Sequence, residues 1–238
     1  MDRNQDIESF YRKFFGNKSR SRRRSLMIDE STDPMNLAQY NVRNTDVAIR
    51  IAGSDRSWAV HETIVAKYSN FFGRGLAGGF SESLKKEINL HEVNETIVDF
   101  VITYMYEGWV QAATKTFDIW MADLLPINTI AQILVLADYL DMPVLCYEAY
   151  KKIESGLARL VATARWDVQF SHSLCVRGKP FLEAVEVLEN GSIIGADISA
   201  KITDLLTGLK GVNTLQDAAR VFESIFGDST TLDWELQW

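Results

Sequence analysis

The sequence predicts an α+β fold, a small sheet covered by helices, followed by an all-helical extension. Three observations predict it. Two short alternating strands open the main apolar part of the chain, amphipathic helices follow with one more short strand among them, and alternation then returns only in the last seven residues. At 238 residues, 47% of them hydrophobic, the chain is long enough to bury a large core.

Each strand is predicted from a period of two. Apolar residues alternate from Val47 to Ile51, residues 53–56 carry turn chemistry, and a second strand is predicted at 57–61. A third is predicted at 87–90. The expected order is therefore strand, strand, helix, helix, strand, helix.

The helices are predicted from apolar residues at helical spacing and from capping residues. A short helix at 6–15 buries Ile7, Phe10, Tyr11 and Phe14. In the main part of the chain, helices are expected at 64–72 with a break at Gly73–Gly79, from the Asn94 cap to Gly108, and at 117–125, 129–140, 144–164, 179–189, 198–209 and 214–226.

The net charge of −7 is unevenly distributed. Residues 1–25 hold eight basic and three acidic side chains, a balance of +5, so the rest of the chain carries −12. An acidic body repels phosphate backbones, which makes nucleic-acid binding unlikely outside the basic arm. The longest apolar stretch, Ile130–Leu140, is too short to cross a membrane, so no membrane partner is expected.

The chain offers little for catalysis or for a cofactor. Cys146 and Cys175 lack the spacing of a zinc site and are expected to be reduced, and the three histidines have no partner at ligand spacing. The glycines at 73–79 follow a helix and are not followed by Gly-Lys-Ser/Thr, which argues against a phosphate loop. We therefore expect a protein without enzyme activity, metal or cofactor.

Several sequence blocks, in the correct order, carry a family resemblance. They are Asp46–Ile49, Trp58–His61 with Ile64–Phe72, Phe80–Ser83, Ile88–Leu90, Tyr104–Gly108 and Ile133–Val144. Together they resemble the BTB/POZ domain over about residues 45–150. The remaining helices look like those of the short single-BTB proteins common in filamentous fungi. The resemblance implies a BTB/POZ fold at 46–150, between a basic arm at 1–45 and a C-terminal helical extension at 151–238.

The resemblance also implies an interaction module that forms homodimers or heteromers. In many members the domain recruits the cullin-3 scaffold of ubiquitin ligases through a hydrophobic residue, any residue and then Glu. Phe80, Ser81 and Glu82 fit that motif. The alternative interpretation is that Phe80 folds into the local core and Glu82 caps a helix. An aspartate and a basic residue form a pocket in the transcription-factor branch, but here Asp46 and Glu62 occupy those positions and are expected to repel.

Two features of the sequence depart from dimerising family members. Residues 33–44 show no steady helical face before the first strand, so domain-swapped dimerisation is uncertain. The connection at 110–127 is longer than usual and aromatic-rich, and it is expected to cover core more readily than to form a surface.

Both ends of the chain carry peripheral motifs. The run Lys18, Arg20, Arg22, Arg23 and Arg24 resembles a nuclear import signal, and Ser25 after it resembles a kinase site. The tail alternates Leu232, Trp234, Leu236 and Trp238 with polar residues, so it is expected to dock as a strand on its own chain or on a partner.

Two functions remain open from the sequence. One is a ubiquitin-ligase adaptor that joins cullin-3 to a substrate. The other is a nuclear scaffold subunit of a transcriptional or chromatin complex, which the basic arm favours. The expected location is the nucleus, the cytoplasm or both.

Overall fold

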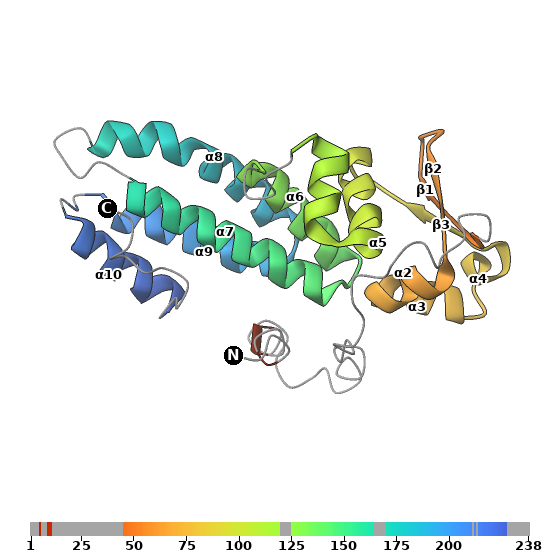
Figure 1. Ribbon diagram of the computed structural model, residues 1–238. Coiled ribbons are helices and arrows are strands. Elements are labelled where there is room, and N and C mark those ends of the chain that lie inside the picture. The colour runs from red at the N-terminus through yellow and green to blue at the C-terminus, as the bar shows by residue number, and fades with distance from the viewer. Residues whose placement is uncertain are drawn as a thin grey trace. The chain divides into compact units, whose positions relative to one another are not determined.

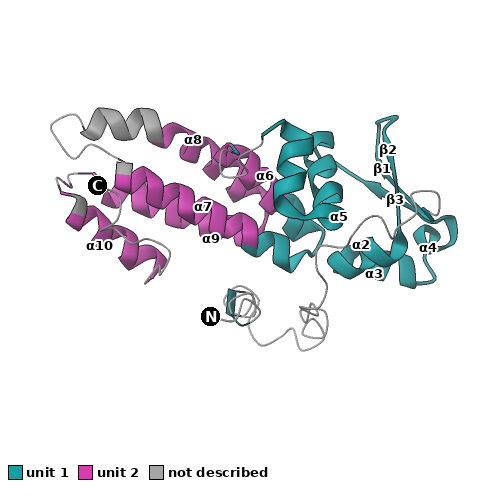
Figure 2. Cartoon of the chain, in the orientation of Figure 1, with its two compact units in different colours: residues 1–125, 136–147 teal, residues 126–135, 148–238 magenta. Residues whose placement is uncertain are grey.

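A computed structural model describes residues 5, 9, 10, 45–119, 125–163, 170–210, 212 and 214–227. The chain divides into two compact units (Figure 2). The first contains residues 1–125 and 136–147, and the second contains residues 126–135 and 148–238. The long helices α6 (Ile127–Tyr139) and α7 (Pro143–Thr163) contribute residues to both units.

The first unit contains a three-stranded sheet in the order β2-β1-β3 (Figure 1). Strand β1 (Val47–Ile51) pairs antiparallel with β2 (Ser57–Val60) and parallel with β3 (Glu87–Leu90). Val47, Ile49 and Ile51 are buried, as the alternation predicts. The hairpin and the third strand therefore form where the sequence places them.

Two helices follow the hairpin, α2 (Glu62–Tyr68) and α3 (Asn70–Ala77). The predicted break at Gly73 is wrong, because the helical run is interrupted at Ser69 and α3 continues through Gly73 and Gly75. Ser69 is extended and buried; its Oγ accepts the Phe72 N–H and donates to the Leu140 carbonyl. The cap, rather than the glycines, sets this boundary.

A short helix, α4 (Ser81–Lys85), precedes β3 and ends in a left-handed residue, Lys86. Helix α5 (Glu95–Phe117) begins at the predicted Asn94 cap, whose side chain accepts the Thr96 N–H. Gly108 interrupts it with φ 80°, a conformation that glycine adopts readily.

The helix predicted at 117–125 is wrong for those residues of the range that the structure describes. Phe117 is the last residue of α5, Asp118 is left-handed, and residues 120–124 lie outside the described residues. The chain resumes the helix after Gly108 because Trp109 packs edge-on against Phe100, with ring centroids 5.1 Å apart. Phe117 also contacts Phe100, so the described part of this connection covers core, as expected.

The second unit is helical. Besides its parts of α6 and α7 it contains α8 (Phe170–Gly191), α9 (Ile193–Gly208) and α10 (Leu215–Phe226) (Figure 1). Helix α8 begins nine residues before the predicted start and contains Pro180, while α9 begins five residues early behind a Ser192 cap. The fold class, a small sheet with many helices and a helical extension, is confirmed.

Close packing in the second unit requires two small residues. A Cβ added at Gly156 would lie 2.7 Å from the Ile127 side chain, and one at Gly191 would lie 2.4 Å from Val135. Glycine at both positions therefore lets α7 and α8 pack close to α6 without displacing these side chains.

Of the helix predicted at 6–15, the structure describes Phe10 as helical and buried. Its ring contacts Tyr147 edge-on, with centroids 5.6 Å apart. Ile7, Tyr11 and Phe14 lie outside the described residues.

Candidate protein interaction surface

Two large apolar side chains of the first unit are exposed at α4. Phe80 is 64% exposed and Leu84 is 82% exposed. The Leu84 N–H donates to the Phe80 carbonyl over 3.2 Å, so the two residues are one helical turn apart. Such a pair on one face is a ready anchor for a protein partner. We call Phe80, Ser81, Glu82 and Leu84 the α4 surface.

Local geometry holds this surface open. Phe80 stands at the N-cap of α4, and a Cβ added at the preceding Gly78 would lie 2.5 Å from the Phe80 ring. The ring therefore packs directly over the glycine backbone. Ser81 Oγ donates to Glu82 Oε2 over 3.1 Å, and both residues are exposed. The alternative in which Phe80 enters the core does not match its exposure.

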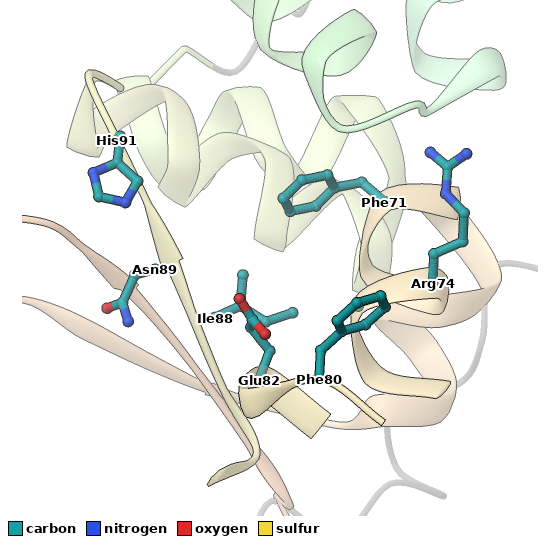
Figure 3. Close-up of a pocket in the computed structure, with 8 residues that line it drawn as sticks. Phe71, Arg74, Phe80, Glu82, Ile88, Asn89 and His91 are labelled. Atoms are coloured by element: carbon teal, nitrogen blue, oxygen red, sulfur yellow. The ribbon is translucent and has the colours of Figure 1, made fainter. Parts of the chain in front are cut away.

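A cavity of about 440 Å³ adjoins the α4 surface (Figure 3). Residues from α3, α4 and β3 line it: Phe71, Arg74, Gly75, Phe80, Glu82, Ile88, Asn89 and His91. Figure 3 shows the Phe71 and Phe80 rings beside Ile88. Phe71 also contacts Tyr139, with centroids 5.4 Å apart, and Tyr139 is exposed. The wall of the cavity thus combines two aromatic rings, those of Phe71 and Phe80, with charged and polar side chains.

Each of the two acidic residues expected to repel has a partner of its own. Asp46 Oδ1 accepts the backbone N–H of Glu62 over 2.7 Å, which places a carboxylate at the N-terminus of α2. The Glu62 carboxylate instead pairs with Lys86 over 2.5 Å. The capping hydrogen bond and the ion pair therefore offset the expected repulsion.

His61 is hydrogen-bonded just after the end of β2. Its backbone N–H donates to Tyr106 Oη over 2.8 Å, and its Nδ1 lies 2.9 Å from the same oxygen. Burial is the main cause that raises the pKa of Tyr106 above 10.0. The nearby Asp46 charge adds to this effect, whereas the His61 hydrogen bond opposes it.

A polar network that the sequence did not indicate joins the hairpin to α5. Asp99 accepts from Trp58 Nε1 over 2.6 Å and pairs with Arg56, whose guanidinium also lies over the Trp58 ring. Ser54 Oγ donates to Glu95 over 2.5 Å. Turn chemistry at 53–56 was the signal available for this network. The network joins the turn after β1 to the first turns of α5, and its polar side chains bond to one another.

Other candidate residues fall outside the described part. The basic residues Lys18–Arg24, Ser25 and the tail Leu232–Trp238 are not among the described residues, and neither is the side chain of Cys175. Cys146 is buried. Among the described residues, the structure contains no group of three potential metal ligands and no helix long and apolar enough to span a membrane.

The first unit is thus a small sheet packed with helices, with Phe80 and Leu84 exposed just before the third strand. The family model for the BTB/POZ domain matches residues 36–155, and the chain belongs to the BTB/POZ family. The family is a class of protein-protein interaction modules that are generally non-catalytic and that mediate partner binding and dimerisation. No curated protein matches the chain.

Proposed function

We propose that the protein is a non-catalytic adaptor whose α4 surface recruits a cullin-3 ubiquitin-ligase scaffold. The observation that carries the proposal is the joint exposure of Phe80 and Leu84 on a short helix before β3. Burying two large apolar side chains against a partner is favourable by about 1.5–3 kcal/mol each. Glu82, exposed on the same helix, adds a directional charged contact.

The proposal assigns Gly78 a positioning role. Because the Phe80 ring occupies the space that a Cβ at Gly78 would take, a larger residue there displaces the ring without removing it. The second unit, with its own helical core, is the proposed site for a substrate.

Binding of the purified full chain to the N-terminal region of cullin-3, measured by calorimetry, tests the proposal. We expect Phe80→Ala and Leu84→Ala each to weaken binding at least tenfold, and Gly78→Ala to weaken it less. Val110→Ala is the matched control, because Val110 is 56% exposed on α5 and lies outside the α4 surface. Unchanged affinity in Phe80→Ala, or no binding of the wild-type chain, would reject the adaptor function.

The second candidate is a nuclear scaffold subunit that assembles through its BTB domain, and the basic run Lys18–Arg24 favours it. Its test is a fluorescent fusion in which residues 17–25 are deleted. A lower nuclear fraction with unchanged expression supports the import signal, and an unchanged fraction rejects it. Purification of bound proteins, with cullin present or absent, separates the two candidates.

A further inference from the structure

On the outer edge of β3, some backbone groups have no hydrogen-bond partner among the described residues. Ala48 N–H donates to the Lys86 carbonyl and Ala52 N–H to that of Leu90, so Ile88 and Leu90 face β1 in the parallel ladder. The amides of Glu87 and Asn89 therefore point away from the sheet, and β3 is the last strand in the order β2-β1-β3. An open edge of this kind is a template for another strand.

The cavity described above lies along this edge and not along the opposite one. Its lining joins Ile88 and Asn89 of β3 to Phe71 and Gly75 of α3 (Figure 3). A Cβ added at Gly75 would have the Ile88 side chain as its nearest neighbour, at 3.9 Å, which is an ordinary contact. An added strand would thus find backbone partners along β3 and the Phe71 and Phe80 rings for its inward apolar side chains. We call this site the β3 groove.

The chain itself contains a segment with the matching pattern. Leu232, Trp234, Leu236 and Trp238 alternate with Asp233, Glu235 and Gln237, which would give an extended strand one apolar and one polar face. Its four large apolar side chains need cover from water. Paired with β3, alternate side chains would point toward the Phe71 and Phe80 rings and the others toward solvent.

We propose that the β3 groove of one copy binds the segment Leu232–Trp238 of a second copy as an added strand. Only residues 228–231 separate the segment from Gly227 at the end of α10, a tether of about 14 Å at full extension. The groove of a second copy can receive the segment whatever the distance between β3 and α10 within one chain. The contact is head-to-tail, and it is inferred without recourse to the proposed cullin function.

Full-length variants test each half of the contact. Asn89→Pro removes an outward N–H while the bonds to β1 remain, and proline is tolerated on edge strands. Gly75→Leu places a side chain in the cavity, at a helical position where leucine is favoured over glycine. Trp234→Ser with Trp238→Ser removes the segment's aromatic side chains. We expect each change to weaken self-association at least tenfold by analytical ultracentrifugation, with unchanged circular dichroism.

Ala59→Pro is the matched control. Ala59 is exposed on β2, the opposite edge strand, and the register places its amide away from β1. We expect self-association within twofold of wild type. An equal loss in Ala59→Pro, or wild-type association in Asn89→Pro, overturns the assignment to β3.

A mixing experiment separates a second copy from the chain's own segment. The Asn89→Pro chain keeps its segment, and the double tryptophan variant keeps its groove. In a tagged capture assay, the mixture should associate more strongly than either variant alone, because one intact contact is restored. Failure of the mixture to exceed both single variants overturns docking between copies.

Discussion

The Tyr106 hydroxyl contacts two groups of a single residue, His61. Its oxygen accepts the His61 backbone N–H and lies within hydrogen-bond distance of His61 Nδ1. The hydroxyl is therefore a fixed part of the junction between the end of β2 and α5. Sequence patterns placed His61 at a strand end, but they did not indicate its partner, which lies 45 positions further along the chain.

The raised pKa of Tyr106 predicts a loss of stability in alkali. Because the pKa in the folded state lies above the ordinary value of 10.0, the folded state holds this proton more tightly than the unfolded state. This contribution is full below pH 10 and is lost as pH rises through the folded-state pKa. We expect Tyr106→Phe to flatten the fall in unfolding free energy above pH 10, measured by urea denaturation.

The same substitution should lower stability at neutral pH by about 1–2 kcal/mol, because the His61 N–H loses its acceptor. Tyr139→Phe, which removes an exposed hydroxyl, is the control. If the unfolding free energy fell equally steeply above pH 10 in the wild type and in Tyr106→Phe, this account would be contradicted.

At the scale of elements, capping residues set several helix boundaries. Ser69 separates α2 from α3, Ser192 begins α9 and Thr214 begins α10. Of these, Ser69 makes a second hydrogen bond, from its Oγ to the carbonyl of Leu140, the residue directly after α6, over 2.6 Å. One hydroxyl thus joins segments that lie 71 positions apart in the sequence.

We expect Ser69→Ala to lower the free energy of unfolding by about 2–3 kcal/mol. The loss combines an N-cap, at about 1 kcal/mol, with a carbonyl left without its hydroxyl partner in a buried site. Thr214→Ala, which removes an exposed cap from α10, should cost about 1 kcal/mol. Chemical denaturation of both variants measures the difference. Equal losses would show that the Leu140 bond contributes nothing.

At the scale of the whole molecule, the two proposals share Phe80, which belongs to the α4 surface and also lines the cavity of the β3 groove. A strand in the groove would therefore reduce access to the cullin anchor. If both proposals hold, a peptide of residues 228–238 should compete with cullin-3 for the full chain. In a fluorescence competition assay, saturating peptide should weaken cullin binding several-fold.

The competition assay carries its own controls. A peptide of the same composition without alternation should have no effect, and Asn89→Pro should make cullin binding insensitive to the peptide while leaving the α4 surface intact. Persistent competition in Asn89→Pro would place the peptide on α4 itself and contradict the groove.

Head-to-tail contacts have a further consequence for assembly. Each chain would offer one groove and one segment, so the contact can extend into an open chain or close into a ring, unlike a two-fold interface. Assembly size should then rise with concentration until closure.

The sequence by itself determined the sheet, the family and most helices. Alternation places β1 and β3 where they form, and the Asn94 cap begins α5, because these signals are local and act within a few residues. It also identified Phe80–Glu82 and the alternating tail as candidate sites. The helices missed or misplaced are those whose limits depend on distant contacts.

Tertiary structure alone decided the rest. After Gly108, Trp109 packs edge-on against Phe100, which lies earlier on the same helix. Asp46 accepts a backbone amide of α2, and Glu62 pairs with Lys86 at the end of α4, so each carboxylate has a partner from another element. The β3 groove likewise exists only where α3 and α4 meet a strand edge. Packing partners far apart in the chain decide such features, and neither period nor propensity encodes their distance in space.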